Sequence, residues 1–463
     1  MTLARIGAAL ADWSERWFPD AFIFAMMAVV IVFAAGLFLG SSPHDLVRFY
    51  GEGFWALIPF TMQMVMIIVG GYVVASSPPA HRLIRWLAGI PRTPRGAIAF
   101  IAAVSLATSM VSWGFSLIFS ALLARETVKK VRGVDYRAIG AATYIGLASI
   151  GGIGLSSSAA LLMATPTSIP PALLAISGSI PLSQTIFTWQ SLTLALILFT
   201  SSLAVSYLSA PTFSTRTAES FGVTDDVTHD GAPPQVERAG RRLAPAEWLE
   251  ETPILSIVIG AIGIAYLGQV FARRGPLAAL DLNTYNFSFL MAGLLLHWRP
   301  RSFVKAVHNA VPATAGVLLM FPFYAGIFGM VMGSPIASVM ARFFVGISTR
   351  GTFPIVVAVY TCVLGVFVPS GGSKWLIEAP YILQAGKELH MPLNWVIQIY
   401  NASQPLPNLV NPFLMLPILG ILRIKARDIV GFGLLQLVSN GFLVLLLSWL
   451  LAGTFPEAIG VTP

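Results

Sequence analysis

Charged residues are scarce in this sequence. Of its 463 residues, only 10% are Asp, Glu, Lys or Arg, whereas 56% are apolar. An average soluble protein has about a quarter of its residues charged. The composition therefore excludes most soluble enzymes, DNA-binding proteins and disordered chains. It is typical of a protein that crosses a membrane many times.

Metal ligands and disulfide partners are also few. Cys362 is the single cysteine, so an internal disulfide and a cysteine-based metal site are both excluded. The six histidines are scattered, and none has the spacing of a metal site. We therefore expect no cofactor and no nucleic-acid partner. The first apolar run lacks a small-residue cleavage site, so we expect it to remain as a membrane helix in contact with lipid.

Long apolar runs predict an all-α polytopic membrane protein. A helix needs about 20 apolar residues to cross the bilayer. We expect nine full crossings together with two re-entrant hairpins. The crossings are predicted at 20–40, 53–76, 138–165, 186–208, 252–272, 279–297, 311–333, 394–422 and 429–452.

The apolar run 96–124 has basic residues on both sides. Arg95 precedes it and Arg125 follows it, each within a cluster of further Arg and Lys. Basic residues collect on the cytoplasmic side, which favours a hairpin open to the cytoplasm over one long tilted helix. The stretch 112–116 breaks the run and leaves arms of about 15 residues, shorter than the hydrocarbon core. A second hairpin is predicted around a break at 369–372.

The polar segment 216–251 divides the chain. It is too short and too poor in apolar residues to form its own core, so we expect a cytoplasmic linker. The first half, 1–215, would contain the cytoplasm-side hairpin at about 95–125. The second half, 252–463, would contain an outside-facing hairpin at about 351–382. The distribution of Lys and Arg places the N-terminus in the cytoplasm, as expected for a multi-pass protein of a bacterial inner membrane.

The two halves contain an internal repeat. A shift of 257 residues carries Pro78 onto Pro335 and Gly114 onto Gly371, with further matches between them. Five predicted crossings separate the two copies, and this odd number turns the second copy upside down. Inverted repeats with broken membrane helices are the architecture of secondary transporters.

Four interruptions of the apolar pattern are candidates for a binding site. Two are the hairpin tips, and the others are 151–158 and 401–408, the latter followed by Asn411. Irregular backbone at membrane depth must be buried in protein or line a wet cavity, so all four are expected to converge near the midplane. The candidate substrate-binding residues are Ser112, Trp113, Gly114, Ser116, Gly154, Ser156, Ser157, Ser158, Ser370, Gly371, Gly372, Ser373, Lys374, Asn408 and Asn411.

The chemistry of these residues suits a small anion. Helix N-termini carry free N–H groups and a partial positive charge that favour a carboxylate, and Ser and Asn side chains add donors. Unwound carbonyls with Ser and Asn oxygens would equally suit Na⁺ at the hairpin tips. Alternatively, the small residues only permit close packing of helices. Phe60 and Phe321 either line a pocket for a short acyl tail or pack between helices.

Two ionisable residues lie at predicted membrane depth. Lys374 and Glu378 are four residues apart, which places them on one face of a helix. Such residues are expensive in a bilayer and are functional candidates. They would form an internal salt bridge, handle substrate and proton, or extend to the interface. In the second case Lys374 would receive the carboxylate and Glu378 would be a coupling group. Gln63 is a further coupling candidate, because it is the polar exception on its helix.

The chain also resembles a known family over nearly its whole length. The most specific stretches are Phe321-Pro322-Phe323-Tyr324-Ala325-Gly326 and Pro369-Ser370-Gly371-Gly372. In these two stretches the chain is similar to the bacterial short-chain fatty acid transporter family. This family contains the acetoacetate and butyrate carriers of the ion transporter superfamily. Further stretches with this resemblance are Trp17-Phe18-Pro19-Asp20, Gly53-Phe54-Trp55, Met62-Gln63-Met64, Ala124-Arg125-Glu126, Asp135-Tyr136, Gly154-Leu155-Ser156-Ser157-Ser158, Ala164-Thr165-Pro166, Thr352-Phe353-Pro354 and Lys425-Ala426-Arg427-Asp428-Ile429.

The resemblance implies import of short-chain monocarboxylates such as butyrate, acetate and acetoacetate. At the level of the superfamily it implies a homodimer with a fixed scaffold and a transport domain that moves as an elevator. The coupling ion, H⁺ or Na⁺, stays open. The chain departs from the family at Lys374 and Glu378, where neutral polar residues are usual, at Ser373, where glycine is usual, and at 403–405, where the family has Glu-Gln-Trp. The substrate could therefore be another small carboxylate.

Two other functional classes are weighed against a transporter. A passive channel is the first, because hairpins also build pores. A membrane-embedded enzyme is the second, since Ser116 offers a nucleophile. However, no histidine is predicted beside Ser116, and Glu378 has no predicted carboxylate partner. We therefore do not expect an enzyme.

Overall fold

The computed structural model describes residues 21–211, 215–222, 244–411 and 413–455. These residues are helical with connecting loops, and no strand occurs among them, which confirms the predicted all-α fold. Seven helices in this part of the chain are long and apolar enough to cross a membrane. The stretch 17–20 and most of the predicted linker lie outside the described residues.

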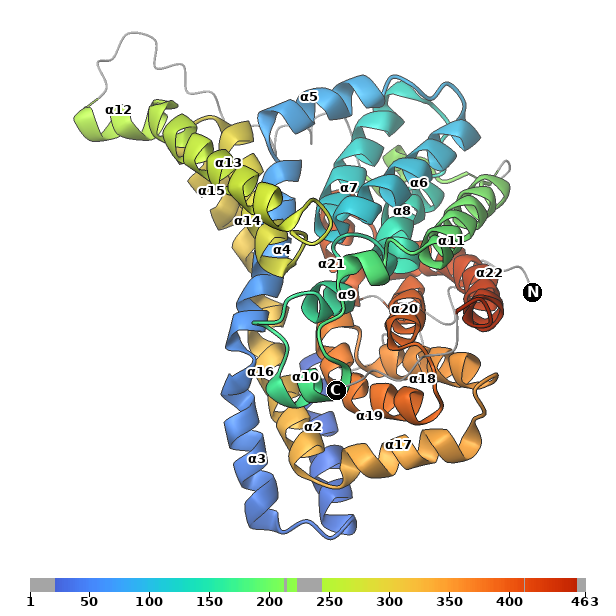
Figure 1. Ribbon diagram of the computed structural model, residues 1–463. Coiled ribbons are helices and arrows are strands. Elements are labelled where there is room, and N and C mark those ends of the chain that lie inside the picture. Colours follow the sequence, from blue (N-terminus) through green and yellow to red (C-terminus); the bar gives the residue numbers. More distant parts are fainter. Residues whose placement is uncertain (1–20, 212–214, 223–243, 412, 456–463) are drawn as a thin grey trace.

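The first half of the chain runs through the helices drawn in blue to green in Figure 1. They are α2 (Ala21–Phe38), α3 (Pro43–Ala56), α4 (Ile58–Ala75), α5 (Pro78–Leu87), α6 (Pro94–Val111), α7 (Trp113–Lys130), α8 (Tyr136–Ile145), α9 (Ser158–Met163), α10 (Pro171–Ser177) and α11 (Trp189–Leu208), with a π-helical turn η1 (Gly146–Ile150) and a 3₁₀ turn η2 (Gly151–Ile153) between α8 and α9.

The second half follows in yellow to red. Its helices are α12 (Pro245–Glu251), α13 (Ile254–Arg274), α14 (Leu282–His297), α15 (Pro300–Ala310), α16 (Ala315–Gly333), α17 (Ile336–Ile347), α18 (Phe353–Phe367), α19 (Gly371–Glu388), α20 (Leu393–Ser403), α21 (Leu416–Leu422) and α22 (Ala426–Ala452), with a 3₁₀ turn η7 (Leu406–Leu409) between α20 and α21.

The helix bounds recur at the offset found in the sequence. A shift of 257 residues carries α4 onto 315–332, where α16 lies, and α7 onto 370–387, where α19 lies. The same shift relates α5 to α17, α6 to α18 and α8 to α20. In Figure 1, α5 lies at one end of the molecule and α17 at the opposite end. The second copy is therefore inverted relative to the first.

Three helices of the first half begin at a polar cap followed by proline. The side chains of Ser42, Ser77 and Thr93 each accept a hydrogen bond from a backbone N–H in the first turn of α3, α5 and α6, and each precedes a proline. The cap satisfies one of the unpaired N–H groups, and proline has a backbone angle that suits the first helical position. These pairs explain why the chain turns sharply at both ends of α5.

Both predicted hairpins are present. Ser112 is extended, ends α6 and caps α7, and the Ser116 hydroxyl donates to the Ser105 carbonyl across the two arms at 2.7 Å. The arms have 18 residues each, which is about 27 Å of helix, so the predicted length of about 15 residues was wrong. The helices continue through Arg95 and Lys129, because a charged side chain does not end a helix at the edge of an apolar run. The second hairpin likewise continues to Glu388.

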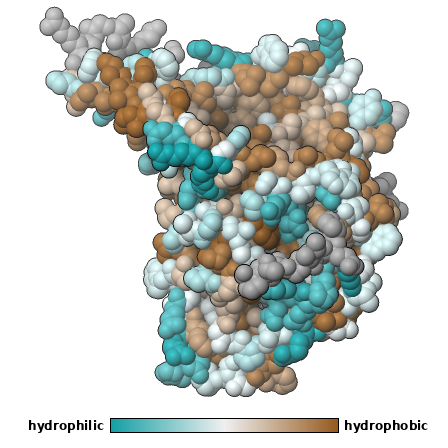
Figure 2. All heavy atoms as spheres, in the orientation of Figure 1, coloured by the Kyte–Doolittle hydropathy of each residue, from teal (hydrophilic) through white to brown (hydrophobic). Residues whose placement is uncertain are grey.

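The helices form two groups. The long-helix group contains α2–α4 and α13–α16, and the hairpin group contains α6–α9, α11 and α18–α22. The groups meet where α7 packs on α4 and where its repeat mate α19 packs on α16. α13 projects to one side with α12, α14 and α15 (Figure 1), and its exposed face is apolar (Figure 2). Ile257, Ile262 and Tyr266 are among the exposed residues of α13, as expected for a surface in contact with lipid.

The two broken crossings pack directly against each other. The first unwinds from Gly146 to Ser157, so its predicted start at Gly151 was wrong, and the second unwinds from Gln404 onward. The prediction that the second interruption starts at Asn401 was wrong, since α20 continues to Ser403. At the crossing point a Cβ on Gly152 would overlap the Asn401 carbonyl oxygen. The two backbones can approach this closely only because residue 152 has no side chain.

We expect the substitution Gly152→Ala to separate the two broken crossings and destabilise the protein. Forcing extra atoms into a packed interior costs about 1–3 kcal/mol, so thermal unfolding in detergent should occur at a clearly lower temperature than for the wild type. Gly346→Ala is the matched control, because a Cβ there has open space around it. Equal melting temperatures for Gly152→Ala and wild type would contradict this packing.

Candidate functional site

The first hairpin tip is bound to the interruption of its own repeat. The Trp113 N–H donates to the Ser156 hydroxyl at 2.9 Å, and the Leu155 N–H donates to the Met110 carbonyl at 2.7 Å. Ser112 and Ser156 are fully buried. These bonds satisfy backbone groups that neither helix can satisfy itself, as membrane depth requires.

The second hairpin tip is held in the same way by the second broken crossing. The Tyr400 hydroxyl donates to the Gly371 carbonyl at 2.7 Å, and the Asn411 amide donates to the Val366 carbonyl at 3.1 Å. A Cβ added to Gly371 would lie 2.9 Å from the Gln404 amide nitrogen, and one added to Gly152 would lie 3.1 Å from the same atom. Gln404 therefore lies between the two repeats, and two of the predicted interruptions and the second tip meet around it.

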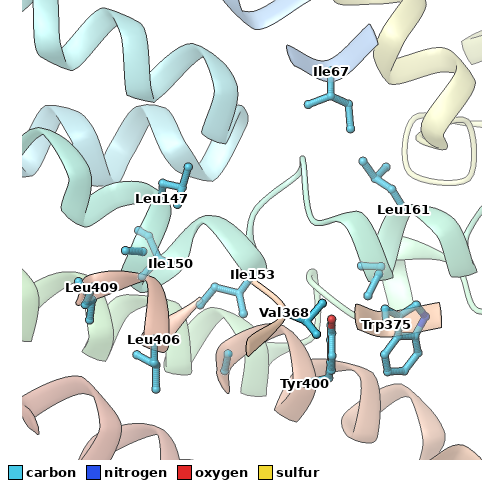
Figure 3. Close-up of a cluster of buried hydrophobic side chains, with 14 of the residues drawn as sticks. Ile67, Leu147, Ile150, Ile153, Leu161, Val368, Trp375, Tyr400, Leu406 and Leu409 are labelled. Carbon is cyan, nitrogen blue, oxygen red and sulfur yellow. The ribbon is translucent and has the colours of Figure 1, made fainter. Parts of the chain in front are cut away.

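Apolar side chains surround this junction. Figure 3 shows Ile150 and Ile153 from the first interruption, Leu406 and Leu409 from the second, and Val368 at the second tip. These side chains are all buried. They exclude lipid and water from most of the junction, so the few polar groups inside it act in surroundings of low dielectric constant.

Lys374 lies inside this junction. Its side chain is fully buried, its ammonium donates to the Thr361 carbonyl at 2.8 Å, and it lies 5.4 Å from the centre of the Tyr400 ring. The carbonyl and the aromatic face both stabilise a cation. Gly365 makes room for the ammonium, since a Cβ there would come within 2.9 Å of the Lys374 nitrogen.

Glu378 is the second buried charged residue of α19. One carboxylate oxygen, Oε2, accepts a hydrogen bond from the Thr361 hydroxyl at 2.6 Å, and the other, Oε1, has no hydrogen-bond partner. Among the described residues no ion pair joins Glu378 to Lys374; Thr361 bonds to both instead. The direct salt bridge considered from the sequence is therefore absent. Extension to the interface is also excluded, because both side chains are fully buried.

Several predicted site residues have local packing roles. The Ser116 hydroxyl is used within the first hairpin, Ser157 caps α9 by accepting from the Ala160 N–H, and Gly114 packs on the backbone of α4 at Ile67. Gly154 packs in the same manner on Met110. For these four residues the geometry therefore agrees with a role in close helix packing, the alternative to substrate binding that the sequence left open.

Other predicted residues present unused polar atoms. Ser373 and Asn408 are buried, and the Ser373 hydroxyl and the Asn408 carbonyl oxygen have no hydrogen-bond partner. Ser158 and Ser370 are half-buried. Gly372 lies against the Phe60 ring, because a Cβ added to Gly372 would be 3.1 Å from that ring. The Phe60 ring in turn stacks on Phe321. Buried polar atoms without partners are rare in native proteins, so Ser373, Asn408 and Glu378 are positions where a ligand or water would bond.

Gln63 lies away from these groups. Its amide donates to Asn283 at 2.7 Å and to Ser168 at 2.9 Å, and its backbone carbonyl accepts from Asn286. These bonds join α4 to α14 and to the loop between α9 and α10. The geometry therefore connects Gln63 with helix association.

Three residues of the junction were missed by the sequence analysis. Thr361, Tyr400 and Gln404 each contact a predicted residue, yet none was named as a candidate. A signal existed for Thr361, because it interrupts the apolar arm 353–367 and antiparallel pairing about residue 369 places it opposite Glu378. No comparable signal marked Tyr400, whose role depends on how the two halves pack.

Comparison with known sequences agrees with this architecture. The family described as "Short chain fatty acid transporter" matches residues 2–451. The chain belongs to this family. It is 33% identical to a "Putative short-chain fatty acid transporter" of Escherichia coli K12, over 95% of this chain and 98% of the relative. A Haemophilus influenzae protein of the same name is 31% identical, over 94% and 97% of the two chains.

Two solved structures of transporters share the fold of this family member. The YdaH transporter of Alcanivorax borkumensis, described as having an unusual topology, superposes with a TM-score of 0.59 at 12% identity, over 95% of this chain and 99% of YdaH. MtrF of Neisseria gonorrhoeae, described with a class of antimetabolite efflux pumps, gives a TM-score of 0.62 at 11% identity over 98% of each chain. At these identities the likeness concerns the fold alone.

We expect Gly365→Ala to destabilise the junction, because the new methyl group would overlap both the Pro407 ring and the Lys374 ammonium and displace the ammonium from the Thr361 carbonyl. The displaced cation would lose about 1.5–3 kcal/mol of charge-assisted hydrogen bonding, so the melting temperature in detergent should fall. Gly441→Ala in α22, where an added Cβ meets nothing, is the control. The structure of this site would be contradicted if Gly365→Ala were as stable as Gly441→Ala.

Proposed function

We propose that this protein is a secondary active transporter that imports short-chain monocarboxylates, such as butyrate, acetate and acetoacetate, through the bacterial inner membrane. It would be ion-coupled, work by alternating access and have its N-terminus in the cytoplasm. The observation that carries the proposal is the fully buried ammonium of Lys374, located where the second hairpin tip meets both broken crossings. A cation buried at this depth is a functional candidate by default.

The surroundings of Lys374 suit a small carboxylate. The ammonium has one hydrogen bond to a carbonyl and no carboxylate partner among the described residues, so it can still donate. The N-terminus of the 18-residue helix α19 begins three residues earlier and adds a partial positive charge. Ser373 supplies a buried hydroxyl without a partner. Phe60 and Phe321 beside Gly372 provide an apolar wall for a short acyl chain.

The arrangement of the two helix groups supports alternating access. Both hairpins belong to the hairpin group, and each packs on the long-helix group mainly through one helix, α7 on α4 and α19 on α16. Because these two contacts are related by the inverted repeat, the hairpin group could occupy two equivalent positions. In this proposal the long-helix group is the scaffold of a homodimer and the hairpin group moves as an elevator, as the resemblance implies.

A channel and a carrier of another carboxylate are the competing functions. A channel conducts without saturation, whereas a carrier saturates and exchanges substrate across the membrane. The buried state of Lys374 and the dense apolar packing around it favour a carrier. An enzyme has less support, because family and relatives are transporters.

We expect purified protein in liposomes to show saturable counterflow of labelled acetoacetate, competed by butyrate and acetate. Protein-free liposomes are the blank, because short acids cross lipid in their neutral form. Lys374→Gln should weaken substrate affinity, since hydrogen bonds to a charged group contribute about 1.5–3 kcal/mol. Lys387→Gln, at the exposed end of the same helix, is the matched control.

Each outcome of this assay decides between the candidates. Uptake that rises linearly with concentration would favour a channel. Counterflow that only a different small carboxylate competes would keep the carrier and change the substrate. Unchanged affinity in Lys374→Gln would contradict substrate binding by the lysine.

A further inference from the structure

The two buried charges of α19 have an unusual relation to each other. Lys374 is the one buried lysine or arginine among the described residues, and Glu378 is the one buried glutamate. They share Thr361, whose carbonyl accepts from the lysine and whose hydroxyl donates to the carboxylate. Since they do not form a direct pair, each keeps capacity for a further partner, and Glu378 Oε1 has none.

In the part of the chain that the structure describes, no other formal charge lies near enough to compensate these two. The titratable groups around them are Tyr360, Cys362, Tyr381 and Tyr400, to which α16 adds Tyr324. Tyr360 and Tyr381 are bonded to each other through their hydroxyls, and Cys362 donates to the Ser403 carbonyl. Helices α9 and α10, which also pack on α19, have no titratable residue, and the charged residue of α17, Arg342, is exposed.

The net charge of the site limits which combinations of substrate and proton it can carry across the membrane. With Lys374 charged and Glu378 ionised, the empty site is neutral. A bound monocarboxylate adds one negative charge, and a proton on Glu378 removes it again. A site with unbalanced charge is expensive to move through a bilayer. The two forms with zero net charge are therefore the empty site without the proton and the loaded site with it.

We propose that Lys374, Thr361 and Glu378 form a charge-balancing unit that couples one proton to each monocarboxylate, with no requirement for Na⁺. The inference rests on the proposed function and adds its coupling ion and stoichiometry. A proton from the outer solution binds to Oε1 of Glu378 while Oε2 keeps its bond to Thr361. The substrate carboxylate then pairs with Lys374, and both substrate and proton are released to the cytoplasm. The ionised Glu378 and Lys374 return empty and neutral.

The repeat supports a single proton per cycle. Shifted by 257 residues, Lys374 and Glu378 correspond to Leu117 and Ala121, and Thr361 corresponds to Val104. The first hairpin therefore lacks all three members of the unit, although it repeats the fold of the second. One unit for each chain predicts a stoichiometry of one to one.

The decisive variant is Glu378→Gln, in which a neutral amide imitates the protonated carboxyl group. Its loaded site is neutral, so counterflow of acetoacetate should continue. Its empty site keeps the charge of Lys374, so net uptake driven by a pH gradient should fall on the order of 100-fold, the penalty for one charge at the centre of a helix. Glu388→Gln, an exposed carboxylate on the same helix, is the control and should behave as wild type.

Retained counterflow also shows that Glu378→Gln is folded, so loss of net uptake cannot be ascribed to unfolding. If the variant lost counterflow as well, its melting temperature in detergent would be compared with that of Glu388→Gln. A folded variant without counterflow would overturn the proposal, and so would one with normal pH-driven net uptake. If the variant is unfolded, the proton, Na⁺ and voltage measurements on wild-type protein test the proposal instead.

Wild-type protein tests the coupling without any variant. A dye inside the liposomes should report one proton entering with each labelled acetoacetate, and replacing Na⁺ by choline should change nothing. Clamping the membrane at about −100 mV should leave accumulation unchanged, whereas a carrier that moved one net charge would change it about 50-fold. A requirement for Na⁺ or a dependence on voltage would overturn this inference alone. Absence of counterflow for every monocarboxylate would instead overturn the proposed function.

Discussion

Unwound backbone inside a membrane has to find its hydrogen-bond partners within the protein, and the centre of this molecule is organised by that constraint. The first hairpin tip donates to Ser156, and the second tip accepts from Tyr400. The two interruptions then pack on each other at Gly152 and Asn401. Neither repeat could present broken helices to lipid alone. The inverted copies have to meet, and their meeting place is where polar groups and small residues concentrate.

The two hairpins share a fold but differ in chemistry. In the first, the hydroxyls of Ser112, Ser116 and Ser156 are used to bind the tip and its two arms to neighbouring backbone. In the second, the Ser373 hydroxyl and one Glu378 carboxylate oxygen are buried without a partner, as are the Ser109 and Ser120 hydroxyls of the first, but only the second hairpin has buried charged groups. The repeat therefore explains the shape of the site, and the substitutions within one copy explain its chemistry. This division is expected where one fold carries many functions.

Much of the architecture could be predicted from the sequence because apolar runs and the polar breaks within them are local signals. The two hairpins and the interruption within 138–165 depend on residues close together in the chain, and the repeat offset appears when the two halves are aligned. Arm lengths were underestimated, since α7 continues through charged residues to Lys130. Glu378 and Lys374 were recognised by their charge, but not their common partner Thr361. Pairing the two arms about residue 369 could have identified Thr361, whereas the apolar pattern of either arm alone does not contain this contact.

In the proposed mechanism, the separation of Lys374 from Glu378 is what allows this buried pair of charges to bind a substrate and a proton. A direct salt bridge in this position would be neutral and satisfied, and a substrate would have to break it before binding. Thr361 holds the two groups apart and stabilises each, through its carbonyl for the ammonium and its hydroxyl for the carboxylate. The ammonium then remains available to an anion and the free carboxylate oxygen to a proton. The titratable side chains around the two charges, Tyr360, Tyr381, Cys362 and Tyr400, are bonded among themselves or to backbone, so they do not compete for either ligand.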